Sequence, residues 1–275
     1  MVKLIIDSPA YASKNYVSEN NIQVVSLSYT LNGVTKQEGY EESWAEFFEN
    51  LKTTKDFPKT SLPSPEEFLK AYEQAGENDD VVVITISKSL SGTYNSACVA
   101  RDMFKAPERV FVIDSGQCAQ SELLLVEEVV DLIKQGKSGK EIYDIAQTIV
   151  TKTCIQFVPS TMEYLRRGGR IGLLSATIAS VLSIKPILAF KNGVLTCAKK
   201  CLGMGKALSE MVKAIPQKFK KIYVCYIHES EILNTLIQKV NEALKLNIVE
   251  AKKIGPVIGS HIGIGAVGLA TLEQY

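Results

Sequence analysis

Apolar runs and helical patterns alternate along the first half of the chain. Residues 81–86 (VVVITI) and 109–114 (RVFVID) are predicted strands. VVVITI and the central VFVI are nearly continuous apolar runs, which are typical of strands covered on both faces in a parallel sheet. Residues 3–7 and 22–29 have the composition of two further strands. This alternation predicts a doubly wound, Rossmann-like α/β domain with a parallel sheet. The helical patterns between the strands cover residues 42–52, 64–76, 94–104, 121–136 and 138–150.

Two of these helices begin with a recognisable capping signal. Ser64 is followed three residues later by Glu67, and Ser138 is followed in the same way by Glu141. In this spacing each side chain satisfies a backbone N–H group at the other position, so we expect helices to start there. Pro65 suits the first helical turn of the earlier one.

The pattern changes after about residue 153, where short strands and helices no longer alternate strictly. Asn192-Gly193 is a strong hairpin signal between two short strands within residues 185–199. We therefore predict two domains, an α/β domain over residues 1–153 and an α+β domain over residues 154–275 with a mixed or mostly antiparallel sheet. Further strands are expected at 154–159, 221–227, 247–254 and 265–273, and helices at 161–170, 176–184, 206–215 and 229–244.

Composition and charge exclude several classes of protein. The 275 residues are 46% hydrophobic and 22% charged, and 31 basic against 30 acidic residues leave a net charge of +1. This balance does not favour binding to nucleic acid. The sequence has neither a signal-peptide pattern nor an apolar run long enough for a membrane span, so we expect a cytoplasmic protein. Six cysteines without a CxxC pair, and two histidines, argue against a metal site.

Polar motifs stand at the ends of predicted elements. In residues 87–97, SKSLSGTYNSA, the Ser91 and Thr93 hydroxyls and the free N–H groups of the following helix can hold an anion, and Gly92 allows close approach. An ordinary helix cap explains the same residues. Thr60 and Ser61 precede a proline-stiffened segment, and exposed hydroxyls of a plain loop are the alternative there.

Two later motifs contain further candidate binding residues, an arginine and a histidine. Arg170 follows a glycine pair and can clamp a carboxylate or phosphate. The alternative is a basic helix end, which Arg166 and Arg167 fit better than Arg170 does. His261 stands among glycines and apolar residues, as a core or loop histidine also would. Residues 263–268 match GxGxxG, but only seven residues follow Gly268, too few for the helix and the acidic residue of a dinucleotide site.

Taken together and in this order, the motifs resemble the DegV family over nearly the whole chain. Its recurring blocks are present as Thr60-Ser61-Leu62-Pro63, Leu90 to Ala97, Gly168-Gly169-Arg170-Ile171, and Gly255-Pro256-Val257 through His261 to Gly265. The pairs Asp7-Ser8 and Asp114-Ser115 also look like family features.

The resemblance implies a lipid carrier with no catalysis of its own. Such a protein binds one long-chain fatty acid, palmitate-, stearate- or oleate-like, in a buried tunnel and presents its carboxyl group to a separate fatty-acid kinase. No metal, nucleic acid or other cofactor is implied, and transient contact with a membrane is compatible with this cargo. Candidate tunnel walls are residues 176–184, Ile171, Leu174 and Ile187. The residues that the resemblance places at the head group are Thr60, Ser61, Ser91, Gly92, Thr93 and His261. It places Arg170 either in this head-group region or on the surface that faces the kinase.

The chain departs from the family pattern at one place, and two other functions stay open. The family often carries an arginine after the second-domain hairpin, where this chain has Cys201 and Leu202, with lysines nearby. Ser91, His261 and Asp114 have the residue types of a serine hydrolase triad, although the G-x-S-x-G elbow is absent. A phosphate- or nucleotide-binding protein is the third alternative, but the P-loop lysine is missing.

Overall fold

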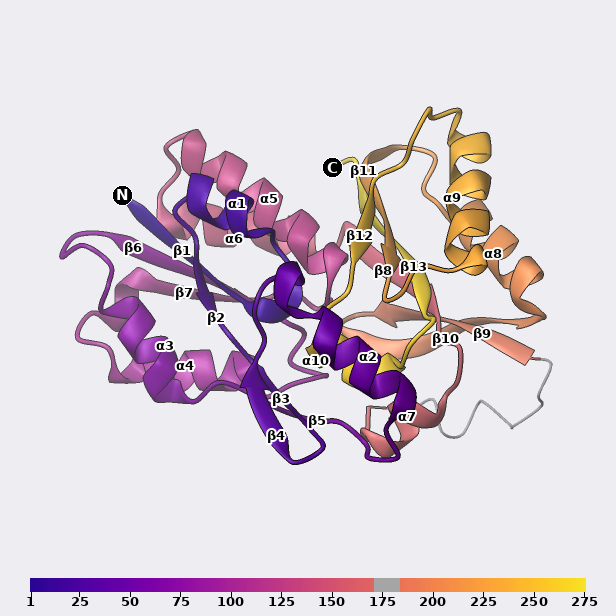
Figure 1. Cartoon of the computed structure of the whole chain (residues 1–275). Coiled ribbons are helices and arrows are strands. Elements are labelled where there is room, and N and C mark those ends of the chain that lie inside the picture. Colours follow the sequence, from indigo (N-terminus) through magenta and orange to yellow (C-terminus); the bar gives the residue numbers. More distant parts are fainter. Residues whose placement is uncertain (171–183) are drawn as a thin grey trace.

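The computed structural model describes residues 1–170 and 184–275, which form two domains side by side (Figure 1). The N-terminal domain contains a sheet of four parallel strands. In sheet order these are β2 (Gln23–Val25), β1 (Val2–Asp7), β6 (Asp80–Thr85) and β7 (Val110–Asp114). The prediction of a parallel α/β sheet is confirmed.

Helices cover both faces of this sheet, as a doubly wound fold requires. Phe68 and Tyr72 pack with Val81 and Val83 on one face. Leu123 and Val126 belong to the cluster on the other face. The first face is covered by α3 (Pro65–Tyr72) and α4 (Thr93–Met103), and the second by α1 (Lys14–Glu19), α5 (Gln120–Lys134) and α6 (Gly139–Val150).

The capping signals in the sequence form the predicted structures. The Ser64 hydroxyl accepts a hydrogen bond from the Glu67 backbone, and the Glu67 carboxylate accepts one from the Ser64 backbone. Ser138 and Glu141 form the same reciprocal pair at the start of α6. Both helices therefore begin where local chemistry alone places them.

A small antiparallel sheet in the N-terminal domain was not predicted. It has the order β4 (Val34–Gln37), β3 (Ser28–Leu31), β5 (Lys59–Ser61). The expected single strand over 22–29 is wrong, because its end belongs to β3 in this second sheet. Asn32-Gly33, with positive φ angles of 51° and 75°, forms the turn and was the signal that could have revealed the hairpin. Short helices complete this domain: η1 (Ser8–Ala10), η2 (Glu41–Ser43), α2 (Ala45–Thr53) and η3 (Pro107–Arg109).

The C-terminal domain is built on a mixed six-stranded sheet in which only β11 and β12 pair in parallel. Its order is β10 (Val194–Leu202), β9 (Ile184–Lys191), β8 (Thr153–Val158), β13 (Val267–Glu273), β11 (Phe219–Tyr226), β12 (Ala251–Lys253). The mixed α+β character is as predicted, and the boundary proposed between residues 153 and 154 falls at the start of β8.

One face of this sheet is covered by helices of its own domain, and the other packs on the N-terminal domain. Leu208 and Leu236 lie in the cluster on the helix-covered face. Phe157 and Phe190 lie on the opposite face, in the same cluster as residues of α5. The helices are α8 (Met204–Lys213) and α9 (Glu231–Leu244), and two short ones, α7 (Glu163–Arg167) and α10 (Pro256–Ile262), lie toward the domain junction.

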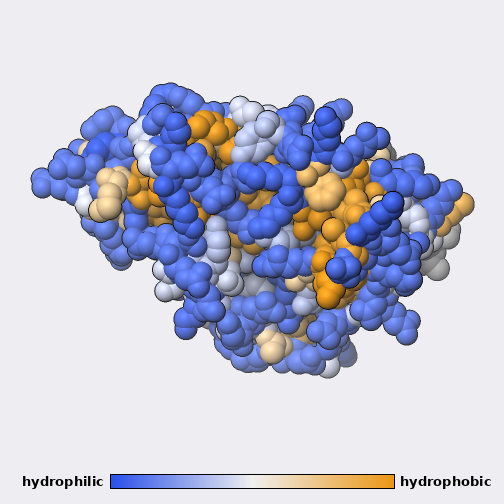
Figure 2. Space-filling view, turned by 90° about the horizontal axis from the view of Figure 1, so that it is seen from above, coloured by the Kyte–Doolittle hydropathy of each residue, from blue (hydrophilic) through white to orange (hydrophobic). Residues whose placement is uncertain are grey.

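The surface and one hairpin turn can be compared with what the sequence predicts. The face seen in Figure 2 is mainly hydrophilic, with hydrophobic residues gathered in limited patches. Among residues 1–170 and 184–275, no helix is both long and apolar enough to cross a membrane. Asn192-Gly193 forms the predicted hairpin turn, with φ angles of 52° and 76°. The helix expected over 176–184 falls almost wholly outside the described residues, and residue 184 itself begins β9.

Candidate ligand-binding site

A pocket lies between the two domains, with about 680 Å³ of empty space between its lining atoms, the open mouth included. Both domains contribute to its wall, and most of the lining side chains are apolar. The polar ones among the described lining residues are Thr60, Ser91, Arg170 and His261. The others are Leu27, Ile86, Leu90, Cys118, Ala119, Ile155, Phe157, Leu165, Phe190, Leu195, Ile254, Val257, Ile258 and Ile262.

Thr60 and His261 meet across the domain junction. The Thr60 hydroxyl and His261 Nε2 are 2.8 Å apart, and the direction of this hydrogen bond depends on which ring nitrogen carries the proton. Thr60 is placed by β5, where it pairs with Tyr29 of β3. His261 is placed by the last turn of α10. Two short elements that are remote in sequence thus assemble one polar contact of the pocket.

The His261 ring is closely packed and mostly buried. Its Nδ1 atom is buried and has no hydrogen-bond partner in the described part of the chain. A Cβ atom on Gly168 would lie 2.4 Å from this Nδ1, so only glycine leaves room for the ring. Burial, and secondarily the positive charge of Arg170, lower the pKa of His261 to about 4. The imidazole is therefore neutral near pH 7.

Arg170 is the only permanently charged side chain among the described lining residues. Its Nε donates to the Leu90 carbonyl oxygen at 3.2 Å and its Nη1 to the Gly168 carbonyl oxygen at 2.6 Å. These two bonds tie the arginine to the loop before α4 and to the glycine against which His261 packs. Since the guanidinium has five N–H donors, its two bonds within the described residues leave donors for an anionic group at the exposed mouth.

The SGT motif forms the N-terminal end of α4, and only part of it reaches the pocket. Ser91 lines the pocket and its hydroxyl lies 2.8 Å from the Thr93 hydroxyl. Thr93 is fully buried beneath it, and Gly92 is the residue that caps α4. A Cβ on Gly92 would come within 3.1 Å of the Leu62 side chain. Gly92 and Thr93 thus support Ser91 and are not among the lining residues.

Ser61 is the one expected head-group residue whose side chain is turned away. It is exposed and is not among the residues that line the pocket. The reason is the two-residue period of a strand, because neighbours in β5 point to opposite faces and Thr60 occupies the inward one. The structure therefore brings together Thr60, Ser91, Arg170 and His261.

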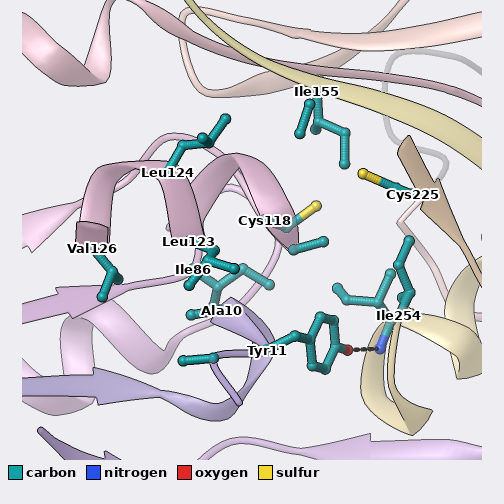
Figure 3. Packing of buried hydrophobic residues seen from close by; sticks show 14 of the residues in the cluster. Ala10, Tyr11, Ile86, Cys118, Leu123, Leu124, Val126, Ile155, Cys225 and Ile254 are labelled. Atoms are coloured by element: carbon teal, nitrogen blue, oxygen red, sulfur yellow. Dashed lines mark hydrogen bonds between the residues drawn. The ribbon is translucent and has the colours of Figure 1, made fainter. Parts of the chain in front are cut away.

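The apolar wall comes from the faces that the two domains turn toward each other. Figure 3 shows Cys118, Ile155, Cys225 and Ile254 facing one another between the domains. Ile187, expected as a wall residue, lies instead in the cluster under α8 and α9. The other expected wall residues, Ile171, Leu174 and 176–184, lie outside the described residues except for residue 184.

Helix α10 was missed by the sequence analysis and contributes several lining residues. Val257, Ile258 and Ile262 recur at helical spacing, and Pro256 after Gly255 is a helix-start signal. The glycines around this segment concealed the pattern, because they resemble a loop. Its hydrophobic face closes the pocket and its last turn carries His261.

The region that lacks the family arginine does not reach the pocket. Lys199 pairs with Glu210 of α8. Cys201 is buried beneath α8 and α9, whereas the Leu202 side chain is 71% exposed. Among the described lining residues, Arg170 thus has no second cation beside it.

The arrangement of a serine hydrolase is not assembled. The Asp114 carboxylate accepts hydrogen bonds from the backbone N–H groups of Lys88 at 3.1 Å and Gly116 at 3.0 Å. The only hydrogen bond of the His261 ring within the described residues goes to Thr60. Nor does the described part of the chain contain a cluster of three or more metal-ligating side chains.

The fold and the pocket define a two-domain α/β protein with a mostly apolar interdomain cavity and a few polar groups at its mouth. The chain belongs to the DegV family, whose model matches residues 1–274. It is 32% identical to a DegV domain-containing protein of Clostridium perfringens, with 99% of both chains covered.

Solved structures of family members share the whole fold. One is a fatty-acid-binding DegV family protein from Thermus thermophilus, which matches with a TM-score of 0.89 and 30% identity over 99% of both chains. Another is a stearic-acid-binding protein from Eubacterium ventriosum, with a TM-score of 0.87 and 26% identity over 100% of this chain and 99% of that one.

Proposed function

We propose that the protein binds one long-chain fatty acid in the interdomain pocket, with the carboxyl group at Thr60, Ser91, Arg170 and His261. The observation that carries the proposal is one arginine among hydroxyls and a neutral imidazole at the mouth of a cavity whose other described lining residues are apolar. A carboxylate needs a cation or several donors when it leaves water, and these groups supply both.

The apolar wall supplies most of the affinity in this proposal. Burial of an acyl chain contributes about 0.8 kcal/mol for each CH₂ group, so a chain of about 15 methylenes has a gross contribution of roughly 12 kcal/mol. The entropy cost of association reduces this figure. The head-group residues then choose between a carboxylic acid and a neutral lipid. The fatty-acid- and stearic-acid-binding relatives of the same fold support an acyl ligand.

We further propose a carrier role, in which the bound acid is passed to a separate fatty-acid kinase. Arg170 is exposed while the apolar lining is buried, so the carboxyl group would lie at the protein surface and the chain inside. A second enzyme can reach a group in that position. The chain's own candidate nucleophile, Ser91, is hydrogen-bonded to Thr93, and within the described residues no hydrogen bond joins its hydroxyl to a base.

Native mass spectrometry of the purified protein, with extraction and identification of any bound lipid, tests the binding proposal. We expect one molecule of a long-chain fatty acid to accompany the protein, or to bind to the stripped protein with one-to-one stoichiometry. A protein whose mass stays unchanged after incubation with fatty acids of roughly 14 to 18 carbons, which bracket the chain of about 15 methylenes, would contradict the binding proposal.

The carrier role has its own test. Protein loaded with a fatty acid is incubated with ATP and a fatty-acid kinase, and hydroxylamine traps any acyl phosphate. We expect the hydroxamate to form only when both proteins are present. Labelling of Ser91 by a fluorophosphonate, abolished in Ser91→Ala, would instead favour the hydrolase alternative.

A further inference from the structure

A buried carboxyl group of the N-terminal domain lies against the start of α10. The Val257 backbone N–H donates to Glu38 Oε1 at 2.7 Å, and the Ile258 N–H donates to the Tyr11 hydroxyl at 3.1 Å. The first N–H groups of a helix have no partner within the helix, and Gly255 at the N-cap has no side chain to offer. The cap is therefore supplied by side chains 219 and 247 residues away in the chain.

Glu38 is fixed in place by groups of its own domain. Its Oε2 accepts a hydrogen bond from the Ser8 hydroxyl at 2.7 Å, and its Oε1 accepts one from the Tyr11 hydroxyl at 3.3 Å. The Leu27 N–H donates to Ser8 Oγ at 3.1 Å, and the Glu38 N–H donates to the Leu27 carbonyl oxygen at 2.8 Å. Since Leu27 itself lines the pocket, this network runs from the pocket wall to α10.

The start of α10 lies very close to Glu38 and Tyr11, and a glycine at position 255 allows this. A Cβ atom on Gly255 would lie 2.5 Å from the Tyr11 ring and 2.9 Å from Glu38 Oε1, so any other residue would push the cap away. The Tyr11 ring is held by Trp44 in an edge-to-face arrangement with centroids 5.2 Å apart. Glu38 is 2% exposed and Tyr11 is 8% exposed.

The far end of the same helix carries His261. From Val257 to His261 the helix rises only about 6 Å, so a shift at its start is transmitted directly to the ring. The ring has little tolerance for a shift, because Gly168 and Thr60 both approach it closely. Val257 and Ile258, which receive the cap, also line the pocket.

We propose that Glu38 and Tyr11 are positioning residues for the head-group site, which hold α10 so that His261 stays against Thr60 and so set the preference for a carboxyl group. This inference rests on the proposed function. The two residues act through the helix and are not among the described residues that line the pocket. A capping side chain next to α10 in the sequence would satisfy the first N–H groups of the helix, but it would not fix the helix to the domain that carries Thr60.

The test combines binding with a spectroscopic reading of His261. The chain has two histidines, so ¹⁵N-histidine labelling reports on His261 with His228 as the internal reference. Dissociation constants are measured for stearic acid and for stearyl alcohol. We expect Glu38→Ala to move the His261 resonances and to lower the acid-over-alcohol preference by about fivefold, as loss of a helix cap would.

Three further variants separate positioning from general destabilisation. Glu38→Gln keeps an amide oxygen for the Val257 N–H and should restore most of the preference. Tyr11→Phe removes the acceptor for the Ile258 N–H and the weaker 3.3 Å hydrogen bond to Glu38, but it keeps the Glu38 carboxyl group, so it should have an intermediate effect. It also tests the proposal if Glu38→Ala fails to fold. Glu128→Gln changes another buried glutamate, which pairs with Lys220 at 2.6 Å and is not among the lining residues, and should leave both readouts unchanged.

The outcomes distinguish this inference from the proposed function. If the wild-type protein binds neither lipid, the proposed function fails. If it prefers the acid, and folded Glu38→Ala and Tyr11→Phe keep both that preference and the His261 spectrum, the positioning role is refuted. An equal loss of acid and alcohol affinity in these variants would likewise refute it, because it would show only a general loss of the pocket.

Discussion

The Thr60 hydroxyl and the His261 imidazole lie 2.8 Å apart, although 201 residues separate them in the chain. Thr60 belongs to a small antiparallel sheet of the first domain and His261 to a short helix of the second. The contact therefore exists only when both domains are folded and docked. It also makes the two residues a natural place to test the binding proposal.

Thr60→Val removes the hydroxyl and keeps the shape of the side chain. We expect the affinity for a long-chain fatty acid to fall by about tenfold, since a hydrogen bond to a charged group contributes about 1.5–3 kcal/mol. The affinity for the matching alcohol should change less. Isothermal titration with both ligands measures the difference.

Ser61→Ala is the matched control for that experiment. Ser61 is the next residue of β5, but its side chain is exposed and points away from the pocket. We expect its affinity for the acid to equal that of the wild type. A larger loss in Ser61→Ala than in Thr60→Val would show that the carboxyl group is bound elsewhere.

Gly168→Ala should disturb the head-group site without touching the apolar wall. The added Cβ would lie 2.4 Å from His261 Nδ1 and 3.0 Å from the Tyr164 carbonyl oxygen, so the ring or the glycine turn must move. We expect weaker fatty-acid binding and a lower melting temperature. Gly205→Ala is the control, because no atom lies within 4 Å of its added Cβ and alanine favours the helix there. Normal binding by Gly168→Ala would contradict the tight packing of His261.

The ionisation of His261 should respond to the ligand. Burial and the positive charge of Arg170 lower its pKa to about 4. A bound carboxylate adds an opposite charge and offsets that of Arg170, so the pKa should rise when a fatty acid binds. Titration of the histidine NMR signals, with and without ligand, measures both values. An unchanged or lower pKa in the complex would place the carboxylate away from the ring.

The stability of the folded protein should fall as the pH rises from about 4 to 7. Burial raises the pKa of Asp7 to about 7, and burial together with the charge of Asp7 raises the pKa of Glu122. The folded state thus binds protons more tightly than the unfolded state does, and stability is lost as these groups ionise. Each such proton contributes a slope of up to about 1.4 kcal/mol per pH unit.

Urea unfolding across this pH range measures that slope. Glu122→Gln should make the slope smaller, since one buried acid no longer titrates. The exposed Glu108→Gln should leave it unchanged. A free energy of unfolding that rises between about pH 4 and pH 7 would show that the buried carboxyl groups of Asp7 and Glu122 are ionised at little cost.

Local signals in the sequence predicted a large part of the fold. The capping boxes at Ser64 and Ser138 and the turn at Asn192-Gly193 form as expected, because each depends on residues within four positions of one another. The buried runs that became β6 and β7 were recognisable because both faces of a parallel sheet are covered. Predictions were wrong where pairing between strands decides the structure. The segment that forms β3 was predicted as part of one strand with β2, but it pairs with β4 and β5.

The sequence by itself determined most of the helices and strands, the fold class and the order of motifs that resembles the family. Only the tertiary structure decided which polar residues share a site. Strand alternation in β5 turns Thr60 inward and Ser61 outward, and the docking of α10 on Glu38 and Tyr11 sets His261 beside Thr60. The physical reason is the separation in sequence of the residues that make contact. Helix caps and turns form between residues a few positions apart, whereas the pocket between the domains depends on contacts between residues 200 or more positions apart.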